Sequence, residues 1–175
     1  PDLQQAFRSM NEVQVFFLTA PKQPRLRLSR RVRLFRRNPR RAVWPATSAM
    51  VRLVTGCRLS HVAIGHGDIM LDQASEGRRC WPLLVYARRH PTLLWMFRVP
   101  VPGPVDLVSR ADPSARISVI RTLIWWITSG KCAATNCVSE ACCVLRIAGV
   151  AIPPTITTPA LLFDWLLCED YQLES

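Results

Sequence analysis

Apolar residues recur in this chain at two different spacings, and the change between them limits the folds that it can adopt. In the first half they form short runs rich in β-branched and aromatic residues, which are typical of buried strands. These runs are Val13–Leu18, Ser60–Ile64, Ile69–Leu71 and Leu93–Val101. In the second half they recur at helical spacing. Strands followed by helices predict an α+β domain, and 175 residues are enough for one such domain with a buried core.

Polar residues and prolines mark where the predicted elements begin and end. We expect a tight turn at His66–Gly67, which would join Ser60–Ile64 to Ile69–Leu71 as a hairpin. Pro100 predicts that the Leu93–Val101 strand ends at a sheet edge. Three helices are expected to start at Asp112–Pro113, at Thr135–Asn136 and at Thr158–Pro159. The first would carry an apolar stripe from Ile117 to Ile127, and the second would stop at Gly149.

The net charge of +11 is concentrated in one segment near the N-terminus. Residues 22–41 hold ten of the 23 basic residues and no acidic one, which leaves 13 basic and 12 acidic residues elsewhere. We therefore expect a single domain over residues 1–175 with an Arg-rich insertion at about 22–45. Such a block of like charge predicts docking on a polyanion or an acidic protein surface, as in a larger assembly. The candidate polyanion-binding residues are Arg30, Arg31, Arg33, Arg36 and Arg37.

The remaining composition bears on compartment and cofactors. The longest strongly apolar run, Leu123–Ile127, is far shorter than the roughly 20 residues of a membrane-spanning helix. The first residues do not resemble a signal peptide, so we expect cytoplasmic synthesis and reduced thiols. The seven cysteines show no CxxC pair and no zinc-finger spacing, so no metal site is expected. Cys142 and Cys143 lie in the middle of a predicted helix, where we expect them to be inert core residues.

Cys137 is the candidate nucleophile of the chain. It follows Asn136, a favoured N-cap residue, so it would occupy the first helical turn, where the helix dipole favours a thiolate. A thiol nucleophile also needs an imidazole base and a polar group that orients the imidazole. His61 lies on one strand of the predicted hairpin and Asp72 lies on the other, within reach across the pair. Gln73 is adjacent to Asp72, and a shift of one residue in register would exchange the two.

These residues resemble the circularly permuted branch of the NlpC/P60 papain-like superfamily, in which the histidine strand precedes the cysteine helix. The resemblance rests on SHVAIGHGDIMLDQA and NCVSEACCVLRIAGV and extends over most of residues 13–168. It implies a permuted papain-like fold, with Cys137 as nucleophile, His61 as base and Asp72 as the orienting residue. It also implies a cysteine hydrolase that cleaves an amide bond in peptidoglycan peptides without a cofactor, with a phage tail or other virion component as one setting.

Two other functions are compatible with the same sequence. The chain could be an adaptor that retains the fold, docks through its Arg-rich segment and no longer catalyses a reaction. It could also be a lipid acyltransferase or thioesterase, as in the related lecithin-retinol-acyltransferase-like enzymes, and this alternative predicts an apolar groove beside Cys137.

Overall fold

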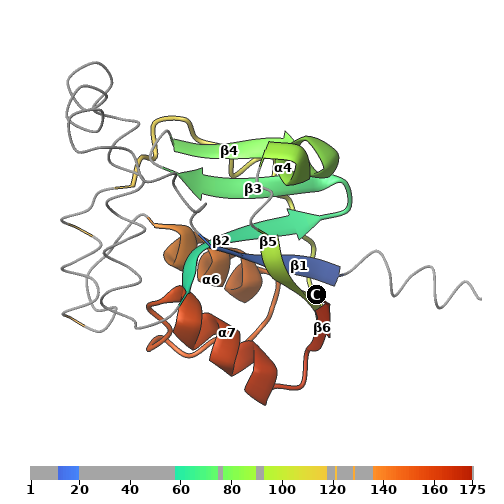
Figure 1. The fold of residues 1–175 in the computed structure, drawn as a ribbon, viewed down its shortest axis with the longest axis vertical. Coiled ribbons are helices and arrows are strands. Elements are labelled where there is room, and N and C mark those ends of the chain that lie inside the picture. Colours follow the sequence, from blue (N-terminus) through green and yellow to red (C-terminus); the bar gives the residue numbers. More distant parts are fainter. Residues whose placement is uncertain are drawn as a thin grey trace, which may run out of the picture.

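The computed structural model describes residues 12–19, 58–74, 77–89, 93–117, 121, 128 and 136–174, and Figure 1 shows their arrangement. Within these residues, six strands form a single sheet and three helices pack against it. The strands are β1 (Glu12–Thr19), β2 (Leu59–His66), β3 (Ile69–Ala74), β4 (Gly77–Pro82), β5 (Leu93–Pro100) and β6 (Gln172–Glu174). The helices are α4 (Leu83–Arg89), α6 (Cys137–Ile147) and α7 (Pro159–Cys168).

The sheet has the order β4-β3-β2-β1-β5-β6, and every neighbouring pair is antiparallel. The predicted α+β class is therefore confirmed. β1 lies between β2 and β5 and is buried on both faces, which accounts for its nearly continuous apolar sequence. Pro100 lies at the end of β5, beyond the β6 ladder, which pairs only Met96–Arg98 of this strand.

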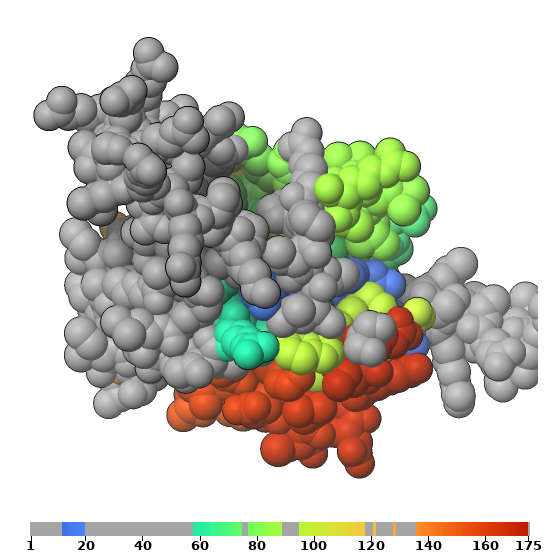
Figure 2. All heavy atoms as spheres, in the orientation of Figure 1, coloured from blue at the N-terminus to red at the C-terminus, as the bar shows by residue number. Residues whose placement is uncertain are grey.

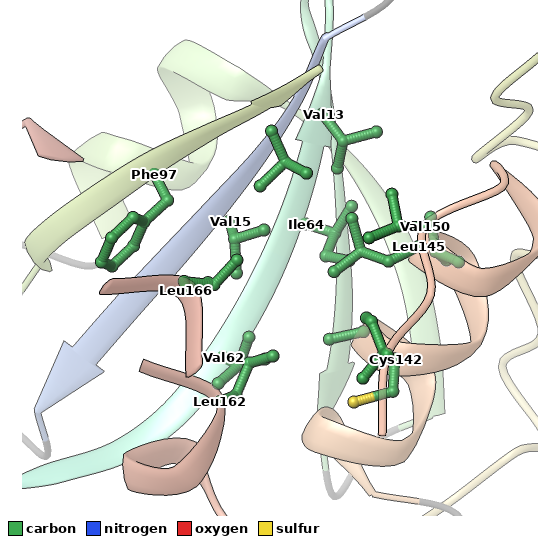
Figure 3. Close-up of a cluster of buried hydrophobic side chains, with 14 of the residues drawn as sticks. Val13, Val15, Val62, Ile64, Phe97, Cys142, Leu145, Val150, Leu162 and Leu166 are labelled. Atoms are coloured by element: carbon green, nitrogen blue, oxygen red, sulfur yellow. The ribbon is translucent and has the colours of Figure 1, made fainter. Parts of the chain in front are cut away.

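Side chains from the two faces of the sheet form two separate apolar clusters. Val15 and Phe17 of β1 belong to the larger cluster, which α6 and α7 cover. Figure 3 shows its strand residues facing Leu145 of α6 and Leu166 of α7. Phe16, between Val15 and Phe17, points to the opposite face and packs in a smaller cluster that includes Tyr86 of α4. The sheet therefore separates α6 and α7 from α4.

The two C-terminal helices begin where the sequence predicted, and α6 also ends before the predicted stop at Gly149. Asn136 caps α6 and Thr158 caps α7, each through its side-chain oxygen. Gly149 follows α6 with φ +93°, a left-handed conformation that glycine adopts without strain. In the space-filling view, atoms of α7 form the side of the molecule farthest from β3 and β4 (Figure 2). Among the described residues, no helix is both long enough and apolar enough to span a membrane.

Three sequence predictions were wrong in part. Asp112 does not cap a helix; it forms a β-bridge with Arg78 of β4, and the backbone up to residue 117 is not helical. The backbone N–H and C=O groups of Asp112 are paired with Arg78 in this bridge. A contact with a distant strand therefore overrides the tendency of Asp112 to cap a helix. The predicted turn begins one residue later, at Gly67 with φ +56°, because His66 still pairs with Ile69. The sequence analysis did not predict β4, α4 or β6, which lack a clear apolar period.

Candidate active site

The first turn of α6 presents Cys137 at a well-capped helix start. The Asn136 side chain accepts a hydrogen bond from the Ser139 N–H at 2.8 Å, and the Ser139 hydroxyl accepts one from the Asn136 N–H at 3.0 Å. This reciprocal capping box fixes the helix terminus on both sides of Cys137. The thiol is partly exposed and lies at the positive end of the helix dipole, which stabilises a thiolate.

His61 and Asp72 form a buried pair on the neighbouring strands β2 and β3. The Nε2 atom of His61 lies 2.5 Å from the Oδ1 atom of Asp72, and the two residues are 3% and 7% exposed. In the strand register His61 lies opposite Leu18, and Asp72 lies opposite Ala63. Leu18 and Ala63 both belong to the cluster on the α4 side, so His61 and Asp72 share that face. The predicted contact between them is present.

Cys137 approaches His61 where the β2–β3 ladder ends. The last residues paired in this ladder are Ala63 and Asp72, and His61 lies two residues beyond them on β2. Cys137 lines a pocket together with Ala63 and Gln73, so it lies over this end of the ladder from the α6 side. Cys137 is one of the groups that raise the pKa of His61, so the thiol lies near the ring. Because Asp72 occupies Nε2, Nδ1 is the ring nitrogen left for an interaction with the thiol.

The charges around His61 favour its protonated form. Burial by itself would lower the pKa of His61, but the nearby charges of Asp72 and Cys137 and the hydrogen bond to Asp72 raise that pKa to about 10. His61 is therefore held in its protonated form at neutral pH, with the Asp72 carboxylate on one ring nitrogen and Cys137 nearby.

The register decides between Asp72 and Gln73 as the orienting residue. Gln73 points to the opposite face from Asp72, where its Nε2 donates a hydrogen bond to the Ala115 carbonyl at 2.5 Å. It lines the pocket beside Cys137 instead of contacting the His61 ring. Asp72 is therefore the residue placed to orient His61, and Gln73 forms part of the wall next to the thiol.

The pocket beside Cys137 lies between α6 and the β2–β3 part of the sheet. Its volume is about 10 Å³, about the space of one water molecule, and it is partly open to solvent. Its walls are mostly apolar, with Gln73 and Glu140 as the polar exceptions; the other lining residues are Val62, Ala63, Ile64, Leu71, Cys137, Ala141 and Val144. The pocket therefore marks a small, mostly apolar hollow beside the thiol.

The sequence analysis missed two groups of residues near the site. Tyr86 of α4 is buried, and its pKa is raised by this burial and further by the nearby charges of Asp72 and Cys137. Glu140 lies one helical turn after Cys137 and binds two arginines from distant segments. The spacing from Cys137 to Glu140 could have indicated a shared helix face, but nothing local in the sequence pointed to Tyr86.

The other cysteines of α6 differ from Cys137 in their surroundings. Cys142 is buried, and this burial raises its pKa to about 12, so the expected inert core role is confirmed. Cys143 was expected in the core as well, but it is partly exposed and accepts a hydrogen bond from Arg110 at 3.2 Å. Among the residues that the structure describes, no group of three or more His, Cys, Asp or Glu side chains could hold a metal ion.

The candidate polyanion-binding residues lie outside the described part of the chain. They are Arg30, Arg31, Arg33, Arg36 and Arg37. The Arg-rich insertion at about 22–45, which contains them, also lies there.

No family model, no curated protein and no solved structure matches this chain. A functional assignment therefore depends on the geometry of Cys137, His61 and Asp72 and on the sequence resemblance given above.

Proposed function

We propose that this protein is a cysteine hydrolase that cleaves an amide bond through Cys137, His61 and Asp72, on a permuted papain-like fold. The observation that carries the proposal is the buried His61–Asp72 pair, 2.5 Å apart, with Cys137 at a capped helix start near enough to act on the pKa of His61. The chain order, with the histidine strand before the cysteine helix, supports the permuted arrangement.

In the first half of the reaction, the Cys137 sulfur attacks the substrate carbonyl carbon and a C–S bond forms. The oxygen of the tetrahedral intermediate takes the negative charge, which the Cys137 N–H at the helix start stabilises. The C–N bond then breaks, and the leaving amine takes the proton from Nδ1 of His61. Asp72 keeps its hydrogen bond to Nε2 throughout, so the ring holds its orientation as its charge changes.

In the second half, water replaces the amine. His61, now neutral, accepts a proton from water at Nδ1 while the water oxygen attacks the thioester carbon. The new C–O bond forms, the C–S bond breaks, and Cys137 leaves as a thiolate beside the imidazolium. The carboxylic acid product departs, and the site returns to its starting charge state without a metal or organic cofactor.

Peptidoglycan peptides are the substrate class that we propose, because the sequence resembles a family that acts on them. Among the described residues, the apolar pocket beside Cys137 has a volume of about 10 Å³, so it does not form the groove that a long-chain acyl group of the acyltransferase alternative would need. A setting in a virion that carries the enzyme to a cell wall remains part of this proposal.

The experiment that tests the proposed chemistry measures iodoacetamide labelling of Cys137 against pH. We expect rapid labelling well below pH 8 in the full chain, and slower labelling in His61→Ala, because the imidazolium no longer stabilises the thiolate. Peptide mapping separates Cys137 from the other six cysteines. The same samples are then incubated with purified peptidoglycan peptides, and new amino groups are counted.

Two control variants show whether a change in labelling is specific to His61 and Cys137. His66→Ala removes a histidine that hydrogen-bonds the Glu12 carbonyl at 3.0 Å, and it should leave Cys137 labelling unchanged. Cys168→Ser removes an exposed thiol and should leave both labelling of Cys137 and amide cleavage unchanged. Labelling of Cys137 that is slow at pH 7 and indifferent to His61→Ala would contradict the proposed site.

A further inference from the structure

Glu140 of α6 holds two arginines that come from distant parts of the chain. Its Oε2 atom lies 2.5 Å from Nη1 of Arg78 in β4, and its Oε1 atom lies 2.7 Å from Nε of Arg110. The three side chains are between 11% and 22% exposed, so this cluster is shielded from solvent more than an ordinary surface ion pair. We call these three residues the Glu140 cluster.

The segment that carries Arg110 is fastened to the sheet at several points. The Arg78 backbone exchanges two hydrogen bonds with Asp112, of 2.9 and 2.8 Å. Gly77 approaches Pro113 so closely that an added Cβ would lie 2.3 Å from the Pro113 carbonyl oxygen. Gln73 binds the Ala115 carbonyl from β3. Arg110 therefore reaches Glu140 from a rigid support, and not from a free loop.

Glu140 is also part of the first turn of α6. Its N–H donates to the Asn136 carbonyl at 3.0 Å, which closes the turn that contains Cys137. Glu140 and Cys137 line the same pocket. Glu140 and Cys137 are therefore held on the same helical turn.

From this geometry we infer that the Glu140 cluster is a positioning device for Cys137, which holds the first turn of α6 against the sheet and adds a surplus positive charge beside that turn. The two guanidiniums and the carboxylate leave one net positive charge, and Glu140, which binds both arginines, lies one helical turn after Cys137. Without the arginines, Glu140 alone would repel a thiolate three residues away. The inference rests on the proposed function, because it assigns supporting residues to the same nucleophile.

Several other ionisable groups act on Cys137 or are affected by it, and the test must separate the cluster from them. On the sheet side these are His61 of β2 and Asp72 of β3, with Tyr86 of α4 behind them. On α6 itself Cys142 senses the charge of Cys137, and Cys143 accepts a hydrogen bond from Arg110 at 3.2 Å. His61, Asp72, Tyr86 and Cys142 are unaltered in variants of the Glu140 cluster. Arg110→Gln removes the contact to Cys143, and peptide mapping separates labelling of Cys143 from labelling of Cys137.

The experiment measures iodoacetamide labelling of Cys137 against pH in Arg110→Gln, Arg78→Gln and Glu140→Gln. Loss of either arginine should move the midpoint of the labelling curve upwards, by about half a pH unit. Glu140→Gln leaves both guanidiniums and should move the midpoint downwards by about the same amount. All three variants should lower the plateau rate of peptide cleavage by about 3- to 10-fold, because Cys137 loses its support.

Two controls distinguish this device from general loss of stability. Arg98→Gln removes an arginine that pairs with Glu174 at 2.6 Å, on the far side of the sheet, and should move neither the midpoint nor the plateau. Arg110→Lys retains the charge without the guanidinium geometry, so its midpoint should stay at the wild-type value while its plateau falls. Urea unfolding of each variant reports whether it is folded under assay conditions.

The results separate this inference from the proposed function. Opposite midpoint shifts for the arginine and glutamate variants support the positioning device, and shifts of the same sign or no shifts overturn it. If His61→Ala fails to slow labelling while the opposite shifts are present, the proposed hydrolase is overturned and the charge effect of the cluster on Cys137 stands. If His61→Ala slows labelling and the cluster variants behave like wild type, the hydrolase stands and the cluster has no such role.

Discussion

Replacing Asp72 by Asn tests the central electrostatic feature of this site, the buried His61–Asp72 pair. The change keeps the size of the side chain and the capacity for one hydrogen bond to Nε2, but it removes the negative charge 2.5 Å from the ring. Burial, which lowers the pKa of His61, is then opposed only by Cys137. We expect His61 in this variant to lose its proton at a lower pH than in the wild type.

The size of the effect follows from the linkage between proton binding and folding. The pKa of His61 is about 10 in the folded protein and about 6.5 in an unfolded chain. A pKa that is raised on folding adds stability that is fully present below pH 6.5 and is lost as the pH rises towards 10. Each unit by which folding raises the pKa of His61 corresponds to about 1.4 kcal/mol of stability. The rise from 6.5 to about 10 therefore limits the contribution of His61 protonation to the free energy of unfolding to about 5 kcal/mol.

Urea unfolding of the wild type and of Asp72→Asn at pH 6.5 and pH 8.5 measures this contribution. The variant should be less stable at pH 6.5, by about 3 kcal/mol. The difference between the two proteins should shrink by about 2 kcal/mol at pH 8.5, because the wild type loses part of the His61 contribution over this interval. Titration of buried thiols such as Cys142 affects both proteins equally and cancels in the difference. A difference that stays constant from pH 6.5 to 8.5 would refute the raised His61 pKa.

Two further predictions concern the helix cap and the core. Asn136→Ala should lower the free energy of unfolding by about 1 kcal/mol and also slow iodoacetamide labelling of Cys137. Thr158→Ala removes the equivalent cap of α7; it should lower the free energy of unfolding by about as much and leave the labelling of Cys137 unchanged. Phe17→Ala should cost about 3–5 kcal/mol in urea unfolding, because the ring is fully buried, and a loss below 1 kcal/mol would contradict the described core. Leu173→Ala, at a side chain 40% exposed, is the control and should stay within about 0.5 kcal/mol of wild type.

Much of the candidate site could be predicted from local sequence signals. Asn136 before an apolar helical stripe located the start of α6, and with it the first-turn position of Cys137. The short apolar strand around His61 and the return strand with Asp72 located the hairpin. These signals succeed because capping and short apolar runs depend on residues within a few positions of one another.

The choice between Asp72 and Gln73 could not be made in this way. A shift of one residue in the β2–β3 register exchanges the faces of the two side chains, and the turn at Gly67 lies one residue later than the sequence suggested. The predicted helix start at Asp112 failed for a related reason, because its backbone pairs with Arg78.

The sequence by itself determined the α+β class, the strand and helix that carry the candidate base and nucleophile, the boundaries of α6 and the start of α7. Only the tertiary structure decided that Asp72 binds His61 and that Glu140 joins Arg78 to Arg110. Arg78 is 62 residues from Glu140 and Arg110 is 30 residues from it, so no local pattern relates them. Their meeting depends on how β4 and the segment after β5 pack beside α6, which the whole sheet fixes.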